Sequence, residues 1–296
     1  MSEQGAVIHD LGYRGYDGPR LSDAQVARVL YVSGLRHCFG LGRSGRSKIL
    51  PLGLLGLMLL PALILVGVLV QAKDLLGLSE QIVPYSTYPI TVQLLISVFV
   101  AAQAPVVFSR DLRFRTITLY LARPLRRTTY VLVRWASLVT ATFVVVAAPL
   151  LLLYVGGLLA ELPVGRETGR FVAALAGAAV LSATLGGLAA VVSALTVRRG
   201  LAVAAVIVVL VMSYGVVTTI QGLSEETGRP WLGEAAAAFS PYTLSHHLQV
   251  TLFDVPQATP TPPTGTTADA WTLVATAVAV LLPVLLLLAR YRKVSG

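Results

Sequence analysis

Two places in the sequence hold side chains that could bind a ligand or a partner. His246 and His247 are adjacent, and imidazole is a common metal ligand, but zinc sites take three or four protein ligands and no third accompanies the pair. We therefore favour a loop or interface role for the two histidines over a metal role. The second place is the basic stretch from Phe108 to Trp135, where Asp111 is the only acid. Its arginines are Arg110, Arg113, Arg115, Arg123, Arg126, Arg127 and Arg134.

Signatures of catalysis and of nucleotide binding are missing from the chain. There is no GxxxxGK[ST] phosphate-binding loop, no HExxH zinc motif and no GxSxG nucleophile turn. The single cysteine, Cys38, excludes an internal disulfide and a cysteine-rich metal site. The sequence thus predicts a protein that is not itself an enzyme and that binds no cofactor or metal of its own.

Composition points to lipid as the main solvent of the chain. Apolar residues make up 55% of the 296 residues and charged residues only 12%, whereas soluble domains carry about 25% charged residues. The net charge of +9 is compatible with nucleic-acid binding. The basic residues stand at the ends of apolar runs, however, where an anionic membrane surface accounts for them better. We therefore expect membrane lipid, and no nucleic acid, as a partner.

Six apolar runs are long enough to cross a bilayer, which takes roughly 20 residues of helix. None of them contains Asp, Glu, Lys, Arg or His. A segment within lipid must satisfy its own backbone hydrogen bonds, so the runs are expected to be helical. The sequence predicts an all-α polytopic membrane protein. Its six transmembrane helices would occupy Ile49–Val70, Ile90–Ser109, Trp135–Leu159, Phe171–Val197, Leu201–Ile220 and Trp271–Ala289.

The distribution of charge predicts how these helices are oriented. Six crossings place both termini on one side, and that side holds all but four of the 23 Lys and Arg residues. Positive residues favour the cytoplasmic side, so both termini of a multi-pass cell-membrane protein are expected in the cytoplasm. Residues 1–48 would form a cytoplasmic arm. Residues 49–296 would form the membrane domain, with a cytoplasmic loop at 110–134 and an outer connection at 221–270. The four exceptions are Lys73, Arg166, Arg170 and Arg229.

An amphipathic helix is expected in the N-terminal arm. Ser22 can cap a helix that begins near Asp23, whose acidic side chain suits the first turn. The helix would lie in the membrane interface, or alternatively pack on the cytoplasmic loops as a soluble helix does. Its less polar face would comprise Val26, Val29, Leu30, Ser33 and His37.

Two features of the later chain predict how the spans are packed and connected. The outer connection contains two helix-prone segments that could dip part way into the membrane, followed by an extended, solvated linker from Thr259 to Gly265. Small residues recur at every fourth position of the fourth run, which favours close approach of another helix. They are Ala174, Ala178, Ser182, Gly186, Ala190 and Ala194.

The basic stretch is expected to contain a short helix. Ser109 or Asp111 can cap it, and Pro124 would end it after Ala122, because the residue before a proline avoids helical angles. Such a helix could transmit a partner's motion to the two adjoining spans. Alternatively, its arginines only hold the membrane orientation. Ion-coupled carriers use ionisable residues within their spans, which are missing here, so energy for any transport is expected to come from another subunit.

The same stretch resembles the most recognisable segment of permease subunits in the type-2 ABC exporter family. Their pattern is a Gly-Thr or similar pair, spaced leucines, a small residue, x-Pro-Leu, and basic residues before the next helix. Two positions depart from it, since Arg115 stands where Gly is common and Arg134 where Lys is common. The residues that fit are Arg115-Thr116, Leu119, Leu121 to Arg127, Tyr130 to Leu132, and Arg134.

The resemblance implies a dimer of permease subunits, identical or different, with two ABC ATPase subunits that bind ATP and Mg on the cytoplasmic face. The complex would export an apolar or amphipathic substrate, and an ATP-independent carrier or channel is the alternative. The coupling surface would comprise Asp111, Arg113, Arg115, Thr116, Leu119, Tyr120, Leu121, Arg123, Pro124, Arg198 and Arg199. The path, lined mainly by the second and fifth spans, would carry the polar residues Gln93, Ser97, Gln103, Ser213, Tyr214 and Thr218.

Overall fold

The computed structural model describes residues 22–42, 44–76, 80–109, 126–196 and 198–292, and every regular element among them is a helix. Five helices are long and apolar enough to cross a membrane, which indicates a multi-pass membrane protein and agrees with the predicted all-α class. They are α2 (Arg46–Leu76), α7 (Arg127–Leu159), α8 (Val164–Leu195), α9 (Arg199–Glu226) and α12 (Gly265–Arg292).

The second predicted span differs from the other five. It is divided into a single turn, α3 (Tyr88–Thr91), and a helix of 15 residues, α4 (Gln93–Val107). The break lies at Val92, whose φ of −103° and ψ of 18° depart from helical values. Although α4 is shorter than a typical span, it lies at the centre of the bundle and packs against α7, α8 and α9.

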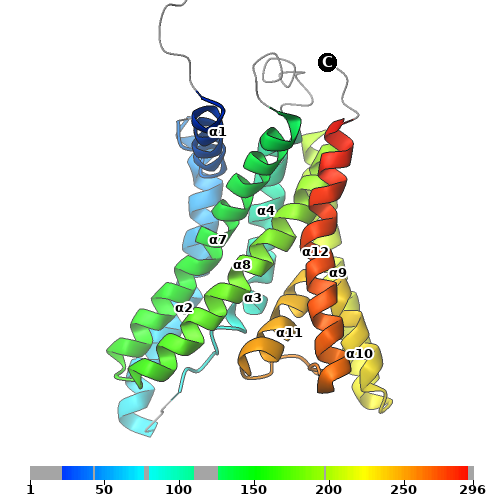
Figure 1. Ribbon diagram of the computed structural model, residues 1–296. Helices are drawn as coiled ribbons and strands as arrows, with labels where there is room; N and C mark the ends of the chain where they lie inside the picture. The colour runs from blue at the N-terminus through cyan, green and yellow to red at the C-terminus, as the bar shows by residue number, and fades with distance from the viewer. Residues whose placement is uncertain (1–21, 43, 77–79, 110–125, 197, 293–296) are drawn as a thin grey trace, which may run out of the picture.

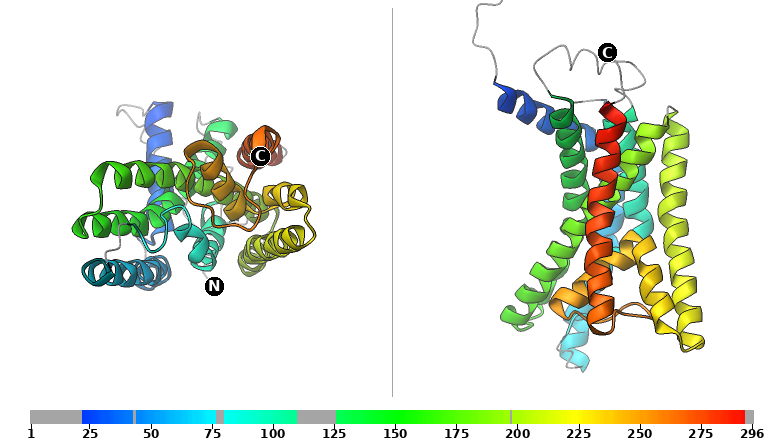
Figure 2. Two further views of the ribbon diagram at one scale, coloured as in Figure 1. Left: turned by 90° about the horizontal axis from the view of Figure 1, so that it is seen from below. Right: turned by 45° about the vertical axis from the view of Figure 1, so that its right-hand side comes forward.

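The long helices alternate in direction along the chain (Figure 1). Helices α2, α7 and α9 run away from the end of the bundle where α1 (Asp23–Cys38) lies, and α4, α8 and α12 run back toward it. We call this end the α1 end and the opposite one the far end. Figure 2 shows α1 lying across the long helices, and α12 finishes at the same end of the bundle.

Helix α1 begins as predicted and packs through a face that overlaps the predicted one. Ser22 caps it by accepting the Gln25 backbone N–H, and the Gln25 side chain accepts the Ser22 N–H in return. Its buried face is made by Leu30, Gly34 and Cys38, whereas Val29 is 61% exposed. The predicted apolar face was therefore wrong in part, because the small Gly34 lets the Ser137 side chain of α7 approach where a bulkier residue would not.

Close packing around α8 confirms the prediction from its small residues. All six residues of the stripe are buried. Three glycines of α8 have different neighbours: Gly177 meets Gln249, Gly186 meets Val139 of α7, and Gly187 meets Pro283 of α12. Side chains at these positions would occupy space that the neighbours fill, so α8 serves as the hub on which the other helices converge.

The contact of α1 with α7 predicts a test of its packing. A Cβ added at Gly34 would lie 2.9 Å from Ser137 Cβ and would overlap Ser137 Oγ, so Gly34→Ala should lower the free energy of unfolding by about 1–3 kcal/mol. Thermal unfolding in detergent measures this loss. The matched control is Gly53→Ala in α2, where nothing lies within 4 Å and the helix should gain slightly. Equal stability of the two variants would contradict the packing of α1.

Candidate functional site

A helical hairpin between α9 and α12 carries the polar centre of the molecule. It consists of α10 (Pro230–Ala236), a short 3-10 helix (Ala237–Phe239) and α11 (Pro241–Phe253). Figure 1 shows it beside α8, α9 and α12, in the half of the bundle away from α1. Every residue of α11 from Pro241 to Gln249 is buried, although most of them are polar. The outer connection is thus folded into the bundle, in agreement with the prediction of two short helices there.

Local chemistry explains where α11 begins. Ser240 has extended backbone angles and accepts the Thr243 N–H, while Pro241 occupies the first helical position, where its missing N–H is harmless. This start places Tyr242 at the buried tip of the hairpin. The Ser-Pro pair was the signal that a helix starts there, but nothing in the sequence indicates what Tyr242 meets.

Tyr242 joins α11 to two other helices. Its hydroxyl donates to the Gln93 carbonyl of α4 at 3.0 Å and lies 2.7 Å from Ser97 Oγ. Because a phenol has one proton, Ser97 is the donor in the second bond. The Tyr214 ring of α9 meets the Tyr242 ring edge-on, with centroids 6.4 Å apart. We call these four residues the tip cluster; it is polar and uncharged, with Ser97 and Tyr242 buried and the other two half-buried.

The tip cluster contains half of the residues predicted to line a path. Gln93, Ser97 and Tyr214 meet there. Ser213 and Thr218 do not, because their hydroxyls donate to carbonyls of α9 itself at 3.0 Å. Gln103 is buried further along α4, toward the α1 end.

The rest of α11 is fastened to α8. Ser245 Oγ donates to the Gly177 carbonyl at 3.0 Å, and Gln249 Nε2 donates to the Ser245 carbonyl at 3.2 Å. The side chain of Gln249 lies directly over Gly177, where a Cβ would displace it. The polar face of α11 is therefore held by the small-residue surface of α8.

The two histidines hold the segment that follows α11. The Ala258 N–H donates to His246 Nε2 at 3.0 Å, and His247 Nε2 lies 3.1 Å from Thr259 Oγ1. Thr261 and Pro263 are buried. The prediction of a solvated linker here was wrong in part: Pro260 and Thr264 are exposed, but side chains of the hairpin supply partners that sequence spacing does not reveal. Among the described residues, no group of three or more His, Cys, Asp or Glu side chains could hold a metal ion.

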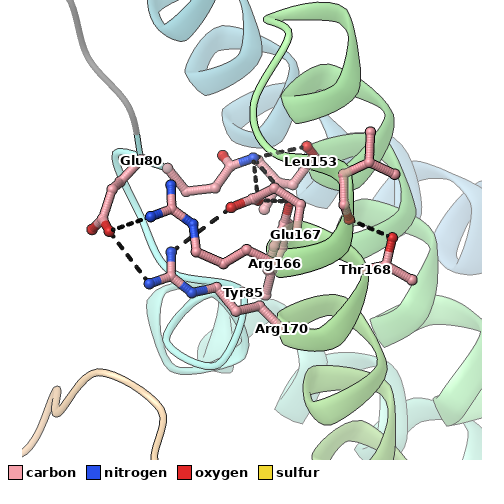
Figure 3. A network of polar contacts seen from close by, with 9 residues as sticks. Glu80, Tyr85, Leu153, Arg166, Glu167, Thr168 and Arg170 are labelled. Carbon is pink, nitrogen blue, oxygen red and sulfur yellow. Dashed lines mark hydrogen bonds and ion pairs between the residues drawn. The ribbon is translucent and has the colours of Figure 1, made fainter.

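A second polar site lies at the far end, around Glu167 (Figure 3). Glu167 is fully buried in the first turns of α8, where the helix dipole favours an acid. Tyr85 Oη donates to Glu167 Oε2 at 2.6 Å, and Gln81 Nε2 lies 3.5 Å from the same oxygen. Burial, together with the Glu167 carboxylate beside it, raises the pKa of the Tyr85 phenol far above its ordinary value, so the phenol stays a donor.

Arginines connect this site to the chain before α3. Arg166 Nη1 and Arg170 Nη2 both approach Glu80 Oε1, at 3.3 and 3.4 Å, and Arg170 Nη1 lies 3.7 Å from Glu167 Oε1. Lys73 of α2 pairs with the exposed Glu161 at 2.7 Å, which lowers the pKa of that carboxyl. Exposed pairs of this kind contribute little stability; one links the turn after α7 to α2, and the others link α8 to the segment before α3.

The six predicted runs carry no charge, but the helices that contain them carry charged residues beyond the runs. The helices extend beyond the apolar runs, so α7 includes Arg134 and α8 includes Glu167, both buried. The Arg134 guanidinium lies 5.5 Å from the centre of the Tyr130 ring. The two charges lie near opposite ends of the bundle, and the apolar composition between them is as predicted.

The predicted coupling surface is described only in part. Arg198 and Arg199 are exposed at the start of α9, at the α1 end. The other predicted coupling residues lie outside the described residues. They are Asp111, Arg113, Arg115, Thr116, Leu119, Tyr120, Leu121, Arg123 and Pro124.

Comparison with known proteins adds no assignment: no family model matches the chain, and no curated protein matches it.

The buried bond between Tyr85 and Glu167 predicts that removing the Tyr85 hydroxyl lowers stability more than removing the Tyr154 hydroxyl. Tyr85→Phe leaves a buried carboxylate without its short bond and should lower the free energy of unfolding by about 1–3 kcal/mol. The control is Tyr154→Phe, whose hydroxyl bonds the neutral Thr168 Oγ1 at 2.9 Å, and it should lose about 0.5–1 kcal/mol. Denaturation of both variants in one detergent tests the difference, and an equal loss would contradict a stronger bond to Glu167 than to Thr168.

Proposed function

We propose that the chain is the membrane-spanning permease subunit of an ATP-driven ABC transporter. The observation that carries the proposal is the α10–α11 hairpin, which places the uncharged tip cluster inside an apolar helix bundle. In this proposal α4 completes six crossings, and both termini lie in the cytoplasm of a cell-membrane protein. ATP is bound and hydrolysed by a separate subunit.

In this proposal the α10–α11 hairpin closes a path that runs along α4. Its tip is attached to α4 by two hydrogen bonds between neutral groups, from Tyr242 to Gln93 and from Ser97 to Tyr242. A neutral hydrogen bond contributes about 1 kcal/mol net, so these two bonds by themselves hold the tip to α4 only weakly. The surroundings are apolar and uncharged, which suits an apolar or amphipathic substrate better than an ion.

The placement of charge supports an external source of energy. The two buried charges described above lie near the helix ends, and Glu167 is engaged by Tyr85. Proton- or ion-coupled carriers use ionisable groups at the depth of the transported ion. A motor that docks at the α1 end, where Arg198 and Arg199 are exposed, accounts for the arrangement better than the alternative of an ATP-independent carrier or channel.

A motor docked at the α1 end is compatible with a second permease subunit packed against the side of the first. Helices α2 and α9 are among the least buried long helices, and both present apolar side chains to the surroundings. Lipid covers such faces in a single subunit, and a second copy or a related chain would cover part of them in the transporter.

Cysteine labelling tests the proposed orientation. The native Cys38 is buried, and burial raises the pKa of its thiol to about 12, so it should not react with a maleimide. In intact cells, Thr264→Cys at the far end should react with a membrane-impermeant maleimide. Ser44→Cys, between α1 and α2, should react only after the cells are opened. The reverse pattern would contradict the orientation.

Co-purification tests the function itself. The tagged chain should bring an ABC ATPase subunit from native membranes, and Leu119→Asp with Leu121→Asp should reduce that yield at least about tenfold, because buried apolar anchors dominate interfaces. The matched control is Leu75→Asp with Leu223→Asp, two exposed leucines at the far end, which should not change the yield. Transport by the pure chain in liposomes without any ATPase would contradict the proposal and favour the carrier.

A further inference from the structure

A cleft opens beside the Glu167 site, between the first turns of α8 and the end of α11. Its volume is about 590 Å³. Its walls carry two charged side chains of opposite sign, Arg170 from α8 and Asp254 after α11. The apolar wall is made by Ala173, Phe253 and Val255. The cleft therefore presents a cation, an anion and an apolar surface to one occupant.

Arg170 has donors available for a ligand in this cleft. A guanidinium carries five N–H donors. Toward the described residues, Arg170 makes one hydrogen bond at the limit of the accepted range, 3.4 Å to Glu80 Oε1, and one ion pair at 3.7 Å to Glu167. Its side chain remains 31% exposed. The remaining donors suit the oxygens of a phosphate, which guanidinium binds in a forked geometry.

Asp254 lies at the cleft, and its carboxylate is available to a ligand. It ends α11 in the left-handed conformation, with a φ of 48°. Its backbone N–H donates to the Val250 carbonyl, whereas its carboxylate makes no bond to any residue that the structure describes. This exposed acid would attract an ammonium group and repel a second anion.

Aromatic side chains place the cleft at a membrane boundary. Phe253 is 45% exposed beside it, and other large aromatic residues are exposed at the same end of the bundle. Such residues gather where acyl chains meet headgroups. They are Trp231, Phe239 and Trp271.

We propose that this cleft binds a phospholipid whose headgroup contains both a phosphate and a primary ammonium, as in phosphatidylethanolamine. The phosphate would lie on Arg170, the ammonium on Asp254, and an acyl chain along Phe253. A purely anionic headgroup fits less well, because Glu80, Glu167 and Asp254 surround the arginines with negative charge. The site does not depend on the proposed transport function, since lipid binding needs no ATPase.

Native mass spectrometry of the delipidated full-length chain tests this site, with phosphatidylethanolamine, phosphatidylglycerol and phosphatidylcholine of identical acyl chains. Phosphatidylethanolamine should bind at least about fivefold tighter than either of the others, because only its headgroup satisfies both charges with hydrogen bonds. Equal binding of the three lipids would overturn the proposal and identify ordinary boundary lipid.

Two variants separate the roles of the charges. Arg170→Gln should weaken phosphatidylethanolamine about tenfold, and Arg170→Lys should restore part of the binding. The control is Arg166→Gln, which also loses a bond to Glu80 but does not line the cleft. Asp254→Asn, at an exposed position that should not disturb folding, should bring phosphatidylglycerol level with phosphatidylethanolamine. Retention of the wild-type preference by Asp254→Asn would overturn the proposal even if Arg170→Gln failed to fold.

Discussion

The close approach of α11 to α8 is the contact on which the rest of the structure depends. A helix as polar as α11 cannot face lipid, because its side chains would be left without partners there. Because Gly177 has no side chain, Gln249 can occupy the space that a Cβ would fill. The Gly177 carbonyl accepts a hydrogen bond from the Ser245 hydroxyl. The polar hairpin can therefore lie within the bundle, and its tip reaches α4.

The two ends of the bundle are built differently. In the half near α1, helix α1 is packed on α7 and the exposed arginines of α9 face outward. In the half near the far end, the hairpin fills the space between α8, α9 and α12. Helix α4 connects the halves, since its start meets Tyr242 and its later residues pack against α7 and α8. A movement of α4 relative to α9 would directly disturb the contacts at the tip of the hairpin.

The far end contains a short buried hydrogen bond and weak, exposed ion pairs. Tyr85 and Glu167 form a short buried bond that fixes the connection before α3 against α8. The arginine contacts to Glu80 are longer and exposed, so they are weak and exchangeable with solvent or a headgroup. The segment after α11 is anchored by His246 and His247 at its start and by the bond from Thr264 to Glu234 at its end. A lipid headgroup in the adjoining cleft would therefore lie beside an anchored segment.

The sequence by itself determined what depends on composition, local hydrogen bonding and helical period. Apolar length predicted the five long helices, Ser22 predicted the start of α1, and the small residues of α8 predicted close packing, because each effect acts within a few turns of one helix. Only the tertiary structure decided which groups meet across helices. The pairing of Tyr242 with Ser97 spans 145 residues, and that of Tyr85 with Glu167 spans 82. The burial of Glu167 likewise depends on Tyr85, a neighbour remote in the chain that local sequence cannot specify.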